Sequence, residues 1–133
     1  MNTVKLTPRG YCHGVVNAIN KVIDLSSNKD LYPIYMLGNI VHNSKIVDAF
    51  TNLGVITLND SSKTRLELLD SIDSGTVVFT AHGVGPSVYK KAHDKGLNVI
   101  DTSCEDVFKS QDKVKEYANL GYDVLFIGKA SHP

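Results

Sequence analysis

The chain has 133 residues, of which 42% are hydrophobic, and its 14 Lys and Arg balance its 14 Asp and Glu at neutral pH. This balance gives no basic field that would attract nucleic acid or an anionic membrane. No apolar run approaches the roughly 20 residues of a membrane span, and the N-terminus lacks the pattern of a secretory signal. We therefore expect a soluble, cytoplasmic protein that binds neither nucleic acid nor membrane.

Short apolar runs alternate with helical patterns along the chain. In chain order, the predicted elements are a strand at 4–6, a helix at 15–25, a strand at 33–37, a helix at 44–53, a strand at 55–58, a helix at 66–72, a strand at 76–80, a helix at 86–95, a strand at 97–100, a helix at 107–120 and a strand at 124–127. The helices show apolar residues at three- and four-residue steps, and the strands are short runs bounded by polar residues or glycine. Strands that alternate with helices in this way form parallel βαβ units.

We predict an α/β fold in two parts. Residues 1–101 form a first domain, a parallel-sheet βαβ unit with a diphosphate-binding edge, and residues 102–133 begin a second, similar α/β domain. The second part is incomplete, because one helix and one strand cannot bury both of their faces. We therefore expect further chain, or a partner, to complete it.

Two cysteines, Cys12 and Cys104, each lie in the turn between a predicted strand and the following helix. Loops at the carboxyl ends of parallel strands converge, and ligands bind there in open α/β sheets. No Cys-x-x-Cys pair is present, and a reducing compartment keeps thiols free, so a disulfide is not expected. Buried packing, catalysis and metal binding remain open, and the turn positions favour the last two over packing.

Three histidines also follow predicted strands: His42, His82 and His132. A single loop histidine is more often solvated than functional, but three at equivalent strand ends indicate a shared ligand site. His13 is not assigned to this site, because Gly14 follows it and leaves its ring free to point away. His93 lies among charged residues of a predicted helix, which indicates a surface position.

The glycines argue against a nucleotide site. The chain has neither a P-loop nor a G-x-G-x-x-G fingerprint, since Gly83-Val84-Gly85 lacks the third glycine. Glycines near the predicted strand ends nevertheless allow a ligand to approach the backbone closely. His42 and His82, together with helix N-termini, are able to hold a diphosphate without arginine.

Five motifs appear in order along the chain. They are Pro8-Arg9-Gly10-Tyr11-Cys12-His13-Gly14-Val15, Ile40-Val41-His42-Asn43, Thr80-Ala81-His82-Gly83-Val84, Asp101-Thr102-Ser103-Cys104 and Ser131-His132-Pro133. Together they resemble the N-terminal part of the 4-hydroxy-3-methylbut-2-enyl diphosphate reductase family of the non-mevalonate isoprenoid pathway. The resemblance covers the whole chain, and it rests on the five motifs in sequence rather than on any one of them.

The resemblance implies an iron–sulfur oxidoreductase that removes the allylic hydroxyl of its substrate and forms isopentenyl and dimethylallyl diphosphate. It implies three α/β domains around a 4Fe–4S cluster held by three cysteines, with an electron donor such as ferredoxin or flavodoxin. Cys12 and Cys104 match the first two metal ligands. The third cysteine ligand lies outside this chain.

The resemblance also assigns the histidines. His42 and His82 match the family's diphosphate-binding residues, and His132 matches a substrate-binding residue with a catalytic part in the proton network. The family's glutamate falls beyond Pro133, so we expect this chain to be inactive alone. One departure is the pair Glu105-Asp106, which stands where the family usually has proline after the second cysteine and adds negative charge beside it.

Two other functions remain open at the level of the sequence. One is a non-catalytic α/β module, which binds a phosphorylated ligand at the histidine edge or a zinc ion with the two cysteines. The other is a globular scaffold without a site. A metal ion retained through chelator treatment would favour the binding module over both the reductase and the scaffold.

Overall fold

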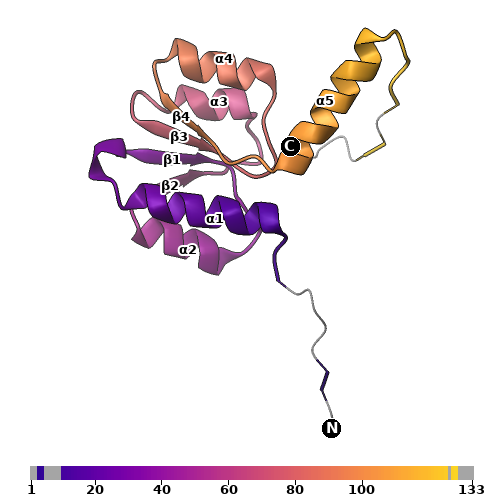
Figure 1. Ribbon diagram of the computed structural model, residues 1–133. Helices are drawn as coiled ribbons and strands as arrows, with labels where there is room; N and C mark the ends of the chain where they lie inside the picture. The colour runs from indigo at the N-terminus through magenta and orange to yellow at the C-terminus, as the bar shows by residue number, and fades with distance from the viewer. Residues whose placement is uncertain (1–2, 5–9, 126, 129–133) are drawn as a thin grey trace.

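The computed structural model describes residues 3–4, 10–125 and 127–128, and it shows one sheet covered by helices on both faces (Figure 1). The strands within these residues are β1 (Ile34–Leu37), β2 (Val55–Leu58), β3 (Thr76–Phe79) and β4 (Asn98–Asp101). All neighbouring strands pair in parallel, in the order β2-β1-β3-β4. The predicted α/β class with a parallel sheet is therefore confirmed.

Helices form the outer layers and carry the chain from each strand to the next. The elements α1 (His13–Ser26) and α2 (Ser44–Asn52) cover one face of the sheet, and α3 (Arg65–Asp70) and α4 (Pro86–Asp94) cover the other (Figure 1). A short 3-10 turn, η1 (Lys29–Leu31), connects α1 to β1. Among the helices in the described part of the chain, none is long and apolar enough to span a membrane.

Alternate side chains of the strands point to opposite faces of the sheet and pack into two separate hydrophobic clusters. On the face of α1 and α2, Met36 and Val78 pack with Val22 of α1. On the opposite face, Phe79 packs with Leu69 of α3. All five side chains are completely buried. Side chains point alternately to the two faces of the sheet, and helices cover both faces, which explains why the two central strands β1 and β3 are largely apolar.

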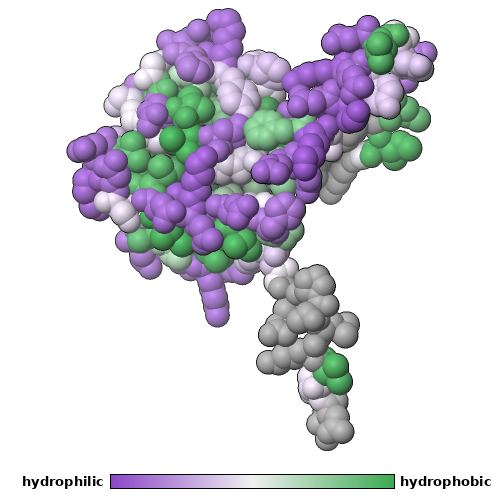
Figure 2. All heavy atoms as spheres, in the orientation of Figure 1, coloured by the Kyte–Doolittle hydropathy of each residue, from purple (hydrophilic) through white to green (hydrophobic). Residues whose placement is uncertain are grey.

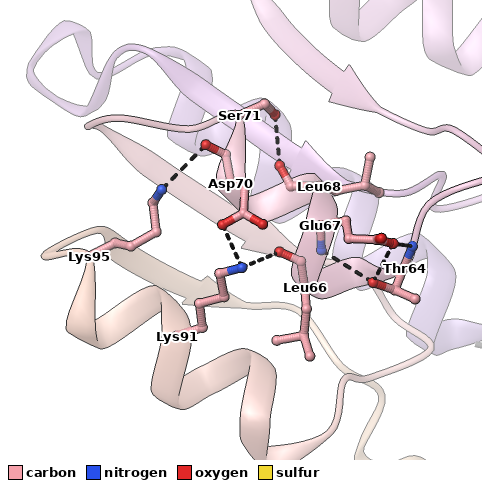
Figure 3. A network of polar contacts seen from close by, with 8 residues as sticks. All are labelled: Thr64, Leu66, Glu67, Leu68, Asp70, Ser71, Lys91 and Lys95. Carbon is pink, nitrogen blue, oxygen red and sulfur yellow. Dashed lines mark hydrogen bonds and ion pairs between the residues drawn. The ribbon is translucent and has the colours of Figure 1, made fainter.

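Polar contacts hold α3 against α4 (Figure 3). Thr64 and Glu67 form a capping box that starts the six-residue helix α3. Lys91 of α4 donates to the carbonyl of Leu66 at 2.7 Å and pairs with Asp70 at 2.6 Å. The hydrogen bond from Lys91 also keeps the pKa of Asp70 below its usual value. These contacts fix a short helix that has little intrinsic stability.

The last helix, α5 (Glu105–Asn119), extends away from the sheet (Figure 1). The structure describes every residue of α5, and none of them is buried. Exposed apolar side chains lie on this helix and in the segment after it: Phe108, Val114, Tyr117, Leu120, Tyr122, Leu125 and Ile127. Figure 2 shows hydrophobic side chains gathered at the far end of α5. Such a surface is typical of an interaction face, and the second domain at 102–133 stays a prediction.

The predicted strand at 124–127 is wrong for the residues that the structure describes. Val124, Leu125 and Ile127 belong to no strand and are exposed. A short strand is stable only when a neighbouring strand pairs with it, and no described strand lies beside this segment. Of the predicted strand at 4–6, only Val4 is described; it is exposed and lies outside any strand.

Candidate functional site

The carboxyl ends of the parallel strands form one edge of the sheet, and the predicted ligand residues follow them. β1 leads into the loop of His42, β3 into the loop of His82, and β4 into the turn of Cys104. β1 and β3 are neighbours, with β2 outside one and β4 outside the other. The strand order therefore reverses between β1 and β3, and open α/β sheets bind ligands at this kind of position.

Hydrogen bonds beyond the end of β4 fix the position of Cys104. The backbone N–H of Thr102 donates to the carbonyl of Phe79 at 3.0 Å, and the Thr102 hydroxyl donates to the same carbonyl at 2.6 Å. The backbone N–H of Cys104 then donates to the carbonyl of Ala81 at 3.1 Å. Because Ala81 precedes His82 directly, the cysteine turn and the histidine loop are tied together.

Asp101 organises the same turn from inside. Its Oδ1 accepts the Ser103 N–H at 2.7 Å, and its Oδ2 accepts a hydrogen bond from the hydroxyl of Tyr89 in α4. Lys21 of α1 donates to the Asp101 carbonyl at 2.8 Å. Burial, together with the Asp101 carboxylate, raises the pKa of Tyr89 to about 12. The Tyr89 hydroxyl therefore stays protonated and keeps donating at neutral pH.

Gly14, buried in the first turn of α1, lies against Cys104. A Cβ atom on Gly14 would stand 2.6 Å from Cys104 Sγ, which is too close for two side chains. Only a glycine leaves the space that the thiol occupies. Cys12 is two residues from Gly14, so their Cα atoms are at most about 7 Å apart. The backbone of Cys12 therefore lies in the same corner of the sheet edge as Cys104.

Both cysteines are free, and their surroundings suit a metal centre. Cys12 is the N-cap of α1 and Cys104 is the N-cap of α5, and within the described residues neither side chain caps its helix. Their sulfur atoms are thus available beside helix N-termini, where the dipole favours negative ligands. With Gly14 leaving room at Cys104, these residues fit a part of an iron–sulfur site.

Two hollows open at this edge of the sheet. The first, of about 250 Å³, lies between α1 and the cysteine turn, and His13, Lys21 and Cys104 are among its lining residues. The second, of about 450 Å³, is lined in part by His42 and Thr57. Each hollow is large enough for a small group such as a phosphate or a metal ion with its water, so both halves of the edge are accessible.

The buried hydroxyls at this end of the sheet that lack a hydrogen-bond partner among the described residues include Thr57 Oγ1 and Thr80 Oγ1. Thr57 lines the hollow beside His42, and Thr80 follows β3 two residues before His82. Buried hydroxyls are normally paired, so an exception needs an explanation such as a ligand or an ordered water. Both hydroxyls therefore mark this edge as a polar binding surface.

The structure brings four of the predicted site residues to one edge, Cys12, Cys104, His42 and His82. His132 lies outside the described residues. The individual roles of all five stay predictions. His93 is exposed on α4, as the sequence predicts.

The sequence analysis missed the residues that support the cysteine turn. Asp101 had a local signal, because an Asp whose carboxylate accepts the N–H two residues on forms a common turn. Tyr89 and Lys21 had none, since each reaches Asp101 from a different helix. His13 was left without a role, yet its Nε2 lies 3.9 Å from Cys104 Sγ.

A parallel α/β sheet with two free thiols and two histidine loops at its carboxyl edge defines the class, a ligand-binding α/β protein with donors for a metal ion and an anion. Comparison with protein families is specific. The family described as LytB protein matches residues 4–133. The chain belongs to the LytB family.

Two similar proteins share the same description. The 4-hydroxy-3-methylbut-2-enyl diphosphate reductase of Brevibacillus brevis is 50% identical over 134 residues, which cover all of this chain and 42% of the relative. The protein of the same description from Symbiobacterium thermophilum is 49% identical, with 45% of it covered. The resemblance stated from the five motifs is therefore confirmed, and the chain spans less than half the length of these relatives.

Solved structures agree. The E-1-hydroxy-2-methyl-but-2-enyl-4-diphosphate reductase of Plasmodium falciparum superimposes with a TM-score of 0.80 and 32% identity, over 95% of this chain and 37% of the other. A second reductase structure, described as the terminal enzyme of the non-mevalonate pathway, gives a TM-score of 0.79 and 31% identity. That match covers 93% of this chain and 41% of the other.

We expect Gly14→Ala to lower the free energy of unfolding, because the new Cβ collides with Cys104 Sγ. Overpacking typically lowers the free energy of unfolding by about 1–3 kcal/mol. The higher helix propensity of alanine offsets up to about 1 kcal/mol of this loss. Urea unfolding measures the net loss, which we expect near 1 kcal/mol. Asn20→Ala, at an exposed position of the same helix, gains the propensity without the collision and should not be destabilised. Equal stability of the two variants would contradict the packing described here.

We expect Tyr89→Phe to lower the free energy of unfolding by about 1 kcal/mol at pH 8, because it removes the hydrogen bond to Asp101. The pKa of Tyr89 is about 12 in the folded chain against a usual 10.0. Its stabilisation is therefore complete below pH 10 and lost as the pH rises towards 12. Urea unfolding at pH 8 and pH 11 should show the difference between native and variant chains shrinking. Tyr35→Phe, at another half-buried tyrosine, is the control. A loss of stability in Tyr89→Phe that is the same at both pH values would contradict the hydrogen bond from Tyr89 to Asp101.

Proposed function

We propose that the chain is the cluster-binding and diphosphate-binding portion of a 4-hydroxy-3-methylbut-2-enyl diphosphate reductase. The observation that carries the proposal is that Cys12, Cys104 and the two histidine loops lie at one sheet edge, in a chain of the LytB family. Relatives of that description are about twice as long, since the match covers 42% of one and 45% of another. The complete reaction therefore requires residues that this chain does not contain.

Cys12 and Cys104 hold the cluster in this proposal. They supply two thiolates from the N-caps of α1 and α5 to a 4Fe–4S cluster, and a cysteine outside this chain supplies the third. When bound, such a cluster supplies electrons and an open iron that acts as a Lewis acid towards the substrate hydroxyl. Gly14 keeps the space next to Cys104 open, and Asp101 keeps the cysteine turn rigid. The chain's own part is to preorganise two ligands.

His42 and His82 bind the diphosphate in this proposal. They lie on loops that leave adjacent parallel strands, so both loops border the same part of the sheet edge. The unpaired hydroxyls of Thr57 and Thr80 offer further donors at the same end of the sheet. Imidazole N–H groups donate hydrogen bonds to phosphate oxygens, so two histidines can hold a diphosphate without an arginine. Binding the diphosphate at the strand ends leaves the allylic end free to reach the cysteine corner.

His132 has the third histidine role in this proposal, positioning the substrate and its proton network, and it lies outside the described residues.

Residues 102–133 begin the second domain. The helix α5 supports this, because it has no buried residue and needs another surface to cover its exposed apolar side chains. Ferredoxin or flavodoxin supplies the electrons. The 133-residue chain alone turns over no substrate.

We expect His42→Ala and His82→Ala each to weaken binding of the allylic diphosphate by about tenfold, because each removes one charge-assisted hydrogen bond of roughly 1.4 kcal/mol. Isothermal titration of the 133-residue chain with the allylic diphosphate measures the affinity directly and needs no cluster. His93→Ala removes an exposed histidine on α4 and is the matched control.

The same titration of Cys12→Ser separates the two halves of the proposal, because diphosphate binding should persist without that thiol. Unchanged affinity in both histidine variants would overturn the diphosphate assignment. Loss of affinity in His93→Ala to the same extent would show that the binding is a non-specific charge effect.

A further inference from the structure

We propose that His13, Cys104 and Asp106 form a mononuclear site for a divalent metal ion, of the class that Zn²⁺ represents. The site is distinct from the cluster of the proposed function and does not depend on it. It uses neither Cys12 nor the histidines of the diphosphate loops. Since Cys104 belongs to both metal sites, the mononuclear site fills only when Cys104 does not hold a cluster.

Three potential ligand atoms meet between two helices. His13 Nε2, from the first residue of α1, lies 3.9 Å from Cys104 Sγ and 3.7 Å from Asp106 Oδ2. Cys104 Sγ lies 3.9 Å from Asp106 Oδ2. Within the described residues this is a nitrogen, a sulfur and an oxygen donor grouped within 4.8 Å of one another. His13 and Cys104 are 91 positions apart in the chain.

The size of the triangle fits a bound ion. A nearly equilateral triangle with sides of 3.7, 3.9 and 3.9 Å has its centre about 2.2 Å from each corner, the side divided by √3. Zinc binds histidine nitrogen and carboxylate oxygen at about 2.0–2.2 Å and cysteine sulfur at about 2.3 Å. An ion placed just out of the plane needs only a few tenths of an ångström of side-chain movement and keeps its fourth position open to water.

Charge favours a cation at this place. Without a metal ion the Cys104 thiol donates a hydrogen bond to Asp106 Oδ2 at 3.9 Å, and a bound cation would replace that proton between the sulfur and the carboxylate. Lys109 pairs with the other carboxylate oxygen, Asp106 Oδ1, at 3.7 Å, and also with Glu105 at 3.9 Å. Asp106 Oδ2 therefore remains directed at His13 and Cys104. His13 and Asp106 are both well exposed, with 68% and 66% of their side chains accessible, so an ion can enter without rearrangement of the fold.

The bound ion would join α1 to α5. Gly14 already places the start of α1 against Cys104, so the ion adds a coordinate link to a contact that exists. No residue of α5 is buried in the described chain, and only Val107 and Gln111, near the start of the helix, are half-buried. A metal ion that binds the folded chain more tightly than the unfolded one raises thermal stability. The sequence alternative of zinc held by the two cysteines makes a different prediction, because it requires Cys12.

The test is an anaerobic titration of the iron-free, sulfide-free 133-residue chain with Co²⁺, a spectroscopic stand-in for Zn²⁺. We expect ligand-field bands of a four-coordinate site together with a thiolate-to-cobalt absorption, both displaced by Zn²⁺. His13→Gln and Asp106→Asn should each weaken Co²⁺ binding by more than about tenfold. Loss of a residue that only hydrogen-bonds to a metal ligand already costs about 10–100-fold in metal affinity, and these two variants remove the ligands themselves. The matched controls His93→Gln and Glu105→Gln should leave the affinity unchanged.

Cys104→Ser should abolish the thiolate-to-cobalt absorption, and Cys12→Ser should leave it intact. Loss of the band in Cys12→Ser, or unchanged affinity in His13→Gln and Asp106→Asn, would overturn the proposal. Circular dichroism of each variant establishes that it is folded, and a metal-induced rise in melting temperature gives a second readout. The assay contains no iron, sulfide or diphosphate, so its outcome is independent of the proposed reductase function.

Discussion

The parallel pairing of the four strands is the constraint on which the site depends. Because all strands run in the same direction, their carboxyl ends meet at one edge, and every loop that leaves this edge adds side chains to one surface. The order β2-β1-β3-β4 places the loops of His42 and His82 side by side and the turn of Cys104 next to them. An antiparallel neighbour would send one of these loops to the opposite edge and divide the ligand set.

A second, local constraint joins the first helix to this edge. Gly14 lies so close to Cys104 that no side chain fits between them, which brings Cys12 into the same corner. Asp101 and Tyr89 then hold the cysteine turn through backbone and side-chain hydrogen bonds. In our two proposals the thiol of Cys104 serves two alternative metal sets, a cluster with Cys12 and a single ion with His13 and Asp106. Only one set can use it at a time.

Much of this arrangement was predictable from local patterns. The apolar runs gave β1, β2, β3 and β4 to within about one residue, and alternation with helices predicted that they are parallel. The positions of His42, His82 and Cys104 followed from their place after strands, whereas Cys12 is placed by the contact of Gly14 with Cys104. What failed were features that depend on distant segments. The run at 124–127 has strand-like composition but no described partner strand, and Tyr89, Lys21 and His13 reach the site only through tertiary packing.

The measurement that tests the central claim most directly uses a hybrid chain. This chain would be joined to the portion of the Brevibacillus brevis reductase that lies outside the match, replacing the 42% of that relative that it covers. Iron and sulfide would be added anaerobically, and the iron content, the electron paramagnetic resonance spectrum and the reduction of the allylic diphosphate would be measured. The account predicts a 4Fe–4S cluster and formation of isopentenyl and dimethylallyl diphosphate, both lost in Cys12→Ser and Cys104→Ser. A folded hybrid that holds its cluster and reduces the substrate equally well in both serine variants would contradict it.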